Sequence, residues 1–246
     1  MSNIALGEAQ TPQDTRIYAI GDVHGYLDLL FKIHDLISDD LAKNPVKHHK
    51  IIHLGDYIDR GPNSKGCIQY LINLMASNEH VSCLKGNHEE KLIRFLDDPI
   101  KTANSFLTYG GAECALSYGL QPVHLSVSDK EMLAFRDELL QSVPRSHIEF
   151  IGELLFSQIE GDYLFAHAGV RPGVALDEQS NHDLMTIRND FISYGGIFEK
   201  VIVHGHTPHH PIEIKQNRIN ADTMAYATQE LTAVVLEGNQ YRILAT

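Results

Sequence analysis

The stretch CLKGNHEE, from Cys83 to Glu90, places an amide, an imidazole and two carboxylates directly after an apolar run. Four other short motifs carry residues of the same kind: GDVHG with Asp22 and His24, GDYIDRG with Asp56, HAG with His167 and GHTP with His206. Carboxylate and imidazole side chains together suit a first-row divalent metal ion that promotes hydrolysis. The sequence therefore predicts a metal site assembled from these motifs.

Six metal-type ligands would converge if the motifs met: Asp22, His24, Asp56, Asn87, His167 and His206. This set is too large for one catalytic metal ion, which must keep an open position, so a pair of ions fits better. Asp56 would then bridge the pair, because a carboxylate has two oxygens. Asn87 would add a neutral oxygen and leave the site positive for an anionic substrate. Asp22 and His24 are two residues apart, so in an extended segment they would point the same way.

The elements that must position these residues follow a repeated pattern. Apolar strands are predicted at 16–20, 50–54 and 80–84, and each is followed by a polar loop and a helix, at 26–41, 64–77 and about 90–98. This order predicts an α/β (α+β) fold in which helices cover a sheet and chemistry lies at the carboxyl ends of the strands.

The rest of the chain is divided between a helical and a strand-rich part. Residues 98–160 are interpreted as a mostly helical insertion over the site. Strands are predicted in the last third, at 162–169, 200–208, 217–223, 231–238 and 240–244. Residues 1–15 are expected to form a loosely ordered tail, because they lack an apolar run, and residues 16–246 a single domain.

The bulk composition excludes some classes of function. The chain has 246 residues, is 43% hydrophobic and carries a net charge of −12. That charge argues against binding to nucleic acid or to an anionic membrane, because like charges repel. No apolar run is long enough to cross a bilayer, and residues 1–15 do not read as a signal peptide. Three widely spaced cysteines, Cys67, Cys83 and Cys114, indicate no disulfide framework, so a cytoplasmic location is expected.

The five motifs, in this order, resemble those of the calcineurin-like metallophosphoesterases. More narrowly, they resemble the serine/threonine phosphoprotein phosphatases of bacteria and phages, from Ile17 to about Leu236. The resemblance implies a four-layer fold, in which two facing β-sheets form a sandwich flanked by helices. It also implies a role for each candidate residue. A first metal ion would bind to Asp22, His24 and Asp56, and a second to Asp56, Asn87, His167 and His206. Arg60, Arg188 and Asn87 would bind the phosphate, and His88 with Asp59 would form a proton-donating pair.

Three positions qualify the resemblance. Thr186 precedes Arg188 by two residues, where the family commonly has an aromatic residue. Met224 replaces a glycine that the family often has near the last strands, which predicts an altered wall of the site and a changed substrate preference. His204 lies two residues before His206 and is interpreted as structural or as support for a ligand, because the pattern needs only one histidine there.

The expected function is hydrolysis of phosphomonoesters by in-line attack of a hydroxide shared by two divalent ions. The first substrates are phosphoserine and phosphothreonine in a phosphoprotein or phosphopeptide, with phosphotyrosine as a further substrate. Mn²⁺ is the first choice of metal, and Fe or Zn²⁺ also suits these ligands. The alternative is a dinucleoside tetraphosphate hydrolase, whose leaving group needs no proton; Asp59 and GNHE favour the phosphatase. A third interpretation is a non-catalytic relative that binds partners through the same site.

Overall fold

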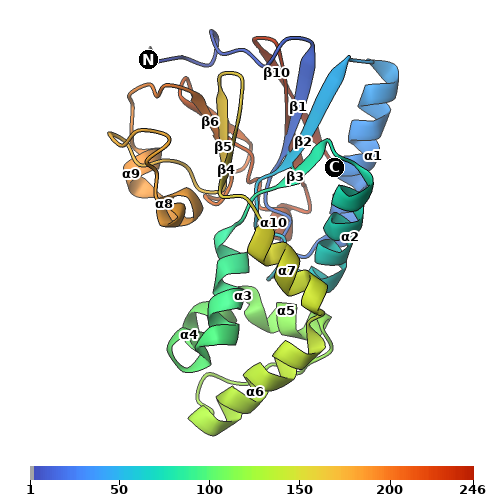
Figure 1. Ribbon diagram of the computed structural model, residues 1–246, viewed down its shortest axis with the longest axis vertical. Coiled ribbons are helices and arrows are strands. Elements are labelled where there is room, and N and C mark those ends of the chain that lie inside the picture. Colours follow the sequence, from blue (N-terminus) through green and yellow to red (C-terminus); the bar gives the residue numbers. More distant parts are fainter. Residues whose placement is uncertain (1–2) are drawn as a thin grey trace.

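The computed structural model describes residues 3–246 and consists of two five-stranded sheets packed face to face and covered by helices (Figure 1). The first sheet has the strand order β10-β9-β1-β2-β3, and its members are β1 (Thr15–Ile20), β2 (His48–His53), β3 (Val81–Cys83), β9 (Thr232–Glu237) and β10 (Gln240–Ala245). The second sheet has the order β4-β5-β6-β8-β7, and its members are β4 (Ser157–Glu160), β5 (Tyr163–Ala166), β6 (Val201–His204), β7 (Glu213–Ile214) and β8 (Arg218–Asn220).

Three neighbouring strands run parallel in each sheet, and β9 and β10 of the first sheet and β4 and β7 of the second run antiparallel to their neighbours. In the first sheet β1 pairs with β2 and β2 with β3 in parallel register. In the second sheet β5 pairs with β6 and β6 with β8 in the same way. The carboxyl ends of parallel strands lie at one edge of a sheet, so the polar loops that follow them meet there.

The helices complete the outer layers. They are α1 (Leu27–Lys43), α2 (Ser64–Ser77), α3 (Asn87–Asp97), α4 (Pro99–Phe106), the π-helical turn η1 (Leu107–Gly111), α5 (Ala112–Ser117), α6 (Asp129–Ser142), α7 (Arg145–Glu153), α8 (Asn181–Thr186), α9 (Asn189–Ile192) and α10 (Ala225–Thr228). Most of the helices between α3 and α7 form a lobe beyond one end of the sheets (Figure 1).

Successive side chains of a strand point to opposite faces of its sheet, and this alternation divides the core into layers. Ile17 and Ala19 of β1 face the space between the sheets, where they pack with Phe165 of β5 and Val203 of β6. The alternate side chains of β1 face the helical layer of α1 and α2. The outer face of the second sheet packs on α8 and α9, which bring Leu184 and Phe191. Both faces of the central strands are therefore buried, which explains their unbroken apolar runs. The predicted four-layer architecture is confirmed.

Some local predictions differ from the structure. The strands β4 and β7 are absent from the sequence-based prediction, because they are short and carry polar residues. Helix α3 begins at Asn87 rather than near residue 90. The described part of the predicted tail is packed: Leu6 and Ala9 are buried between elements of the core, and the Leu6 amide donates to the carbonyl of Gln216. Residues 1–2 lie outside the described residues. No helix of residues 3–246 combines the length and apolarity that crossing a bilayer requires.

A pair of buried histidines links α1 to β2 behind the predicted site. Nε2 of His34 lies 3.1 Å from Nε2 of His53, and both rings are buried. Burial lowers the pKa of His34 to about 4 and the pKa of His53 well below 6.5, because the charged imidazolium loses its hydration. Both groups are therefore neutral in the folded protein at pH 7.

We expect the free energy of unfolding to fall as the pH drops from about 6.5 towards 4. In this window the unfolded chain takes up protons on His34 that the folded chain does not, which costs about 1.4 kcal/mol per pH unit. The variant His34→Gln keeps a hydrogen-bonding group next to His53 and removes the titration. Urea unfolding at a series of pH values should give it a shallower slope. The exposed control His48→Gln should keep the wild-type slope, and an unchanged slope in His34→Gln would contradict the prediction.

Candidate metal centre

The polar loops after five strands converge at one end of the sandwich. The loop after β1 brings Asp22 and His24, and the loop after β2 brings Asp56, Asp59 and Arg60. The turn after β3 brings Asn87 and His88 at the start of α3. The loops after β5 and β6 bring His167 and His206 from the second sheet. The site therefore lies where the two sheets and the helical lobe meet.

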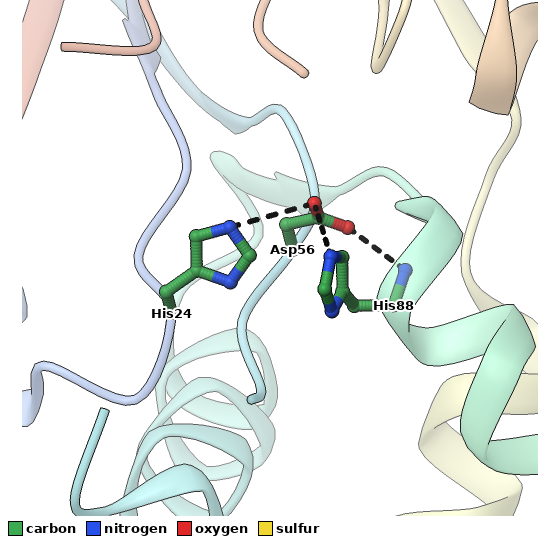
Figure 2. Close-up of side chains that lie close together, drawn as sticks. All are labelled: His24, Asp56 and His88. Carbon is green, nitrogen blue, oxygen red and sulfur yellow. Dashed lines mark hydrogen bonds and ion pairs between the residues drawn. The ribbon is translucent and has the colours of Figure 1, made fainter. Parts of the chain in front are cut away.

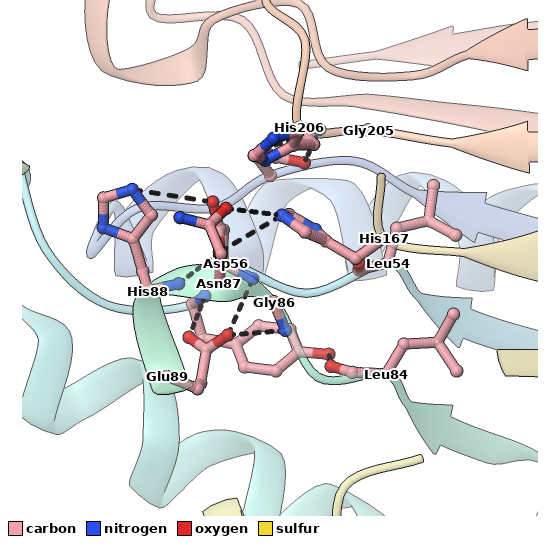
Figure 3. A network of polar contacts seen from close by, with 12 residues as sticks. Leu54, Asp56, Leu84, Gly86, Asn87, His88, Glu89, His167, Gly205 and His206 are labelled. Carbon is pink, nitrogen blue, oxygen red and sulfur yellow. Dashed lines mark hydrogen bonds and ion pairs between the residues drawn. The ribbon is translucent and has the colours of Figure 1, made fainter. Parts of the chain in front are cut away.

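Two groups of buried side chains have the composition of metal sites. His24, Asp56 and His88 form one group, and Asp56, His167 and His206 form the other; within each group the candidate ligand atoms lie within 4.8 Å of one another. Asp56 belongs to both. One of its oxygens is 3.7 Å from Nε2 of His24 and 3.8 Å from Nε2 of His88 (Figure 2). Its other oxygen is 3.4 Å from Nε2 of His167 (Figure 3).

The histidine orientations leave ring nitrogens free to act as ligands. Nδ1 of His24 lies 2.9 Å from the carbonyl oxygen of Ile58, and Nδ1 of His167 lies 2.9 Å from that of Leu54. A carbonyl oxygen only accepts, so each Nδ1 carries the proton and each Nε2 faces Asp56. Nε2 of His206 is buried and has no hydrogen-bond partner among residues 3–246. Such an orphaned nitrogen fits a metal ligand.

Asp22 lies beside the second group. Both of its carboxylate oxygens are 3.2 Å from the backbone nitrogen of His206, and it is a member of neither compact group. Burial raises the pKa of Asp22 well above its ordinary value, and the charges of Asp222 and Asp56 add to this effect. Buried carboxylates that repel one another are stabilised by a nearby cation. The donor set around Asp56 therefore fits two divalent ions.

The carboxylates around His167 raise its pKa as well. Burial lowers its pKa, but the charge and hydrogen bond of Asp56 and the charges of Asp22 and Glu89 together more than offset this, and the pKa of His167 rises to about 9. Positive charge is therefore stabilised at Nε2 of His167. Nε2 also lies 3.1 Å from Oδ1 of Asn87, the first residue of α3. Asn87 is therefore next to the second group, on a helix N-terminus and not on a strand end.

His88 and Asp59 form the predicted pair. Nδ1 of His88 lies 2.6 Å from Oδ2 of Asp59, and both side chains are buried. Burial lowers the pKa of His88, which the charge of Asp56 opposes, and burial raises the pKa of Asp59. The short contact fixes the ring so that Nε2 is the nitrogen directed at Asp56 and the metal groups. The structure thus places His88 close enough to serve as a proton donor or as a ligand.

Arg60 and Arg188 line an open cleft of about 570 Å³ whose wall also includes Asn87, His88 and His206. The guanidinium of Arg60 stacks 4.3 Å above the ring of Tyr226, and one of its nitrogens is 3.5 Å from Nε2 of His88. Neither arginine has a carboxylate within ion-pair distance among the described residues. Both are therefore available to an anion.

The loops that carry the site turn sharply. Five of its residues have positive φ: His24 (47°), Asp56 (55°), Asp59 (71°), Arg60 (65°) and His206 (65°). This left-handed backbone is unfavourable for residues with a side chain, and such strain is typical of functional sites. The prediction that Asp22 and His24 share an extended segment is therefore wrong at His24. The turn, rather than strand alternation, orients that ring.

The structure locates the three positions that qualify the resemblance, Thr186, Met224 and His204. Thr186 lies on α8 and lines the cleft beside Arg188. Met224 has a φ of 60°, so it adopts the backbone that a glycine would favour, but it does not line this cleft. The neighbouring Tyr226 instead contacts Arg60. His204 is fully buried against Phe191, with ring centroids 4.9 Å apart, and belongs to neither metal group.

Glu89 and Gly110 contribute to the site in ways that the sequence did not predict. The Glu89 carboxylate is fully buried and accepts hydrogen bonds from the backbone nitrogens of Asp56 (3.0 Å), Tyr57 (2.7 Å) and Gly86 (2.9 Å) (Figure 3). It therefore holds the loop of Asp56 against the start of α3. Two features of the sequence could have suggested this role: Glu89 is the last residue of the GNHE motif, and it lies in the first turn of a predicted helix.

Gly110, in the predicted helical insertion, contacts Arg60. Its carbonyl oxygen accepts a hydrogen bond of 3.2 Å from the Arg60 backbone nitrogen, and its φ is 107°. A Cβ at this position would lie 2.4 Å from the same nitrogen, so a side chain does not fit. The π-helical turn thus fixes the backbone of an arginine more than forty residues away in the sequence.

We expect Glu89→Ala to lower the free energy of unfolding by about 3 kcal/mol, because it leaves several buried N–H groups without an acceptor. Activity should fall as well, since the Asp56 loop loses its anchor. Chemical denaturation and circular dichroism measure the first effect. Glu149→Ala is the matched control: its carboxylate and its ion-pair partner Arg145 are both exposed, and the loss should stay below about 1 kcal/mol. Equal losses in the two variants would contradict the role of Glu89.

Comparison with known proteins places this arrangement in a family. The calcineurin-like phosphoesterase family matches residues 15–236, which is most of the chain, and the chain belongs to this family. It is accordingly a hydrolase of the metallophosphoesterase type, and its fold and ligand groups agree with that class.

Individual relatives act on different substrates. The chain is 28% identical over 232 residues to the asymmetrical bis(5'-nucleosyl)-tetraphosphatase PrpE of Anoxybacillus flavithermus, covering 87% of this chain and 88% of that protein. Two solved structures share the fold. A candidate diadenosine tetraphosphatase has a TM-score of 0.64 at 18% identity, covering 96% of this chain and 98% of the other. A mutant of a cold-active protein tyrosine phosphatase has a TM-score of 0.60 at 16% identity, covering 97% and 81%.

Proposed function

We propose that this protein is a dinuclear metal-dependent phosphatase that hydrolyses phosphomonoesters, with phosphoserine and phosphothreonine in proteins as its first substrates and phosphotyrosine as a further one. The observation that carries this proposal is the buried His88–Asp59 pair, 2.6 Å apart, beside a cleft lined by Arg60 and Arg188. An alkyl phosphate needs a proton for its leaving oxygen, and this pair is placed to give one.

In this proposal Asp22, His24 and Asp56 hold the first metal ion, and Asp56, Asn87, His167 and His206 hold the second. When bound, the two ions supply Lewis acidity and lower the pKa of a water molecule towards ~7. Mn²⁺ is the first choice, because mixed nitrogen and oxygen ligands suit it. The chain's part is to orient the ligands, through the backbone acceptors behind His24 and His167 and through Glu89 behind Asp56.

The arginines bind the phosphate. Two divalent ions contribute about +4, and the carboxylates of Asp22 and Asp56 together with an attacking hydroxide remove about 3 of it, so only about +1 remains for a phosphate dianion. Arg60 and Arg188 would add positive charge and forked hydrogen bonds to the phosphate oxygens. The stacking of Arg60 on Tyr226 restricts its guanidinium, which reduces the entropy lost on binding.

A second candidate function is hydrolysis of dinucleoside tetraphosphates. The relative from Anoxybacillus flavithermus carries that name and matches 87% of the chain. The bond broken would then be a phosphoanhydride, whose leaving phosphate needs no proton from His88.

The test is a side-by-side measurement of kcat/KM, with Mn²⁺ and after chelation, on a phosphoserine peptide and on diadenosine tetraphosphate. A metal-dependent preference for the peptide would support the phosphatase. A preference for the dinucleotide would support the second candidate. Turnover of both substrates that survives complete chelation of metal ions by EDTA would contradict a metal-dependent mechanism.

A further inference from the structure

The cleft that Arg60 and Arg188 line is also lined by Lys91, and by Arg94, which pairs with Glu90. Lys91 lies in the second turn of α3 and is partly buried. No carboxylate lies within ion-pair distance of its ammonium group among residues 3–246. The adjacent Glu90 does not neutralise it, because that side chain pairs with Lys85 and Arg94, each at 2.9 Å. In a chain of net charge −12, a partly buried lysine that lines an open cleft without an ion-pair partner is available to an anion.

The position of Lys91 is defined by two neighbours. Its Nζ lies 3.4 Å from Nε2 of His88 and 4.5 Å from the centroid of the Tyr109 ring. The other nitrogen of His88 is engaged by Asp59, so Nε2 is the nitrogen that would face the leaving oxygen of a substrate. A donor to that oxygen lies about 2.6–3.2 Å from it. The ammonium group of Lys91 would therefore lie next to the leaving group that His88 faces.

The chemistry of the leaving group decides whether such a cation helps. An alkyl ester leaves as a neutral alcohol once His88 has given its proton, and the ammonium group then has no charge to compensate. A phosphoanhydride leaves as a phosphate, whose negative oxygens an ammonium group stabilises by charge-assisted hydrogen bonds. A cleft that holds both His88 and Lys91 is thus suited to the cleavage of alkyl phosphate esters and of phosphoanhydrides.

We propose that Lys91, held by Tyr109, binds the second phosphate of substrates that contain two linked phosphates, so that the site cleaves the terminal phosphoanhydride of a nucleoside diphosphate in addition to phosphomonoesters. Water adds to the terminal phosphorus and releases one proton to the solvent, the bond from that phosphorus to the bridging oxygen breaks, and the bridging oxygen keeps the electron pair as part of the leaving nucleoside monophosphate. Inorganic phosphate is the other product. This inference rests on the proposed function, since it needs the same metal ions and the same arginines.

Tyr109 contributes through its ring face. It belongs to η1 and is 53% exposed, so it does not serve the core. The ring holds the ammonium group by a cation–π contact, which is favourable at a partly exposed position. Because η1 also carries Gly110, the same turn places both Arg60 and Lys91 around the cleft. The helical lobe thereby sets the distance between the two phosphate positions.

The experiment compares the Mn²⁺-loaded wild type with Lys91→Met on adenosine 5'-diphosphate and on 4-nitrophenyl phosphate, which has no second phosphate. We expect Lys91→Met to lower kcat/KM about 10- to 100-fold on the diphosphate and less than about 3-fold on the aryl phosphate. Lys91→Arg, which keeps the charge, should recover most of the loss. Lys130→Met on the exposed face of α6 is the matched control and should act like the wild type on both.

Three results would overturn the inference. They are an equal loss on both substrates in Lys91→Met, no loss on either, and a wild type that cleaves only the aryl phosphate. All three leave the proposed function standing, because the monoester is still hydrolysed. A Mn²⁺-loaded wild type that cleaves neither substrate would instead overturn the proposed function, and with it the basis of the inference.

Discussion

Replacement of His88 by alanine should lower kcat on a phosphoserine peptide by about 10²- to 10⁴-fold, the contribution expected of a general acid. On an aryl phosphate the loss should stay below about 10-fold, because a phenolate leaves without a proton. The reason is the geometry of the pair: Nδ1 of His88 is held 2.6 Å from Asp59, so the ring is fixed and Nε2 is the nitrogen that lies beside the cationic side chains of the cleft, Arg60 and Lys91. Steady-state kinetics on the two substrates, at saturating Mn²⁺, measure the difference.

The same variant separates two roles for His88, because its Nε2 is also 3.8 Å from Asp56 in the first ligand group. If His88 is the proton donor, calorimetric titration should show the wild-type number of bound Mn²⁺ ions. Loss of one ion together with equal losses on both substrates would show that His88 is a ligand. His124→Ala, at an exposed position of the helical lobe, is the control and should keep wild-type metal binding and turnover.

Asp56→Asn is expected to have the largest effect of all. Asp56 is the one residue common to both groups of ligands, with one oxygen towards His24 and the other towards His167. An amide has the same shape, but it offers one oxygen and no charge, so the affinity for both ions should fall together. Turnover should drop by at least about 10³-fold, because each ion contributes several kcal/mol to the reaction.

Metal content and turnover measured together test this prediction. Calorimetric titration with Mn²⁺ should show weak or absent binding of both ions in Asp56→Asn, while far-ultraviolet circular dichroism should show an intact fold. Asp39→Asn, on the exposed side of α1, is the matched control for the loss of one charge. Tight binding of one ion in Asp56→Asn would show that Asp56 does not bridge, and the two-group arrangement would need to be revised.

The sequence by itself determined the fold class and most of the site. Apolar runs such as 16–20 and 50–54 are buried on both faces, so their composition alone marks them as central strands. The polar residues that follow each run are therefore predicted at one edge of the sheets from the order of the runs alone. Asp56, His167 and His206 meet as expected because the strands that carry them are parallel within each sheet.

Only the tertiary structure decided what lies around that set. Glu89, Gly110, Lys91 and Tyr109 act through contacts between segments distant in the sequence, and no local pattern encodes such contacts. The positive φ of His24 likewise results from the packing of its loop and not from the propensity of a histidine. Residue types and their order along parallel strands specify which ligands converge. The orientation of each side chain, and the cations that face the leaving group, depend on how the helical lobe packs against the two sheets.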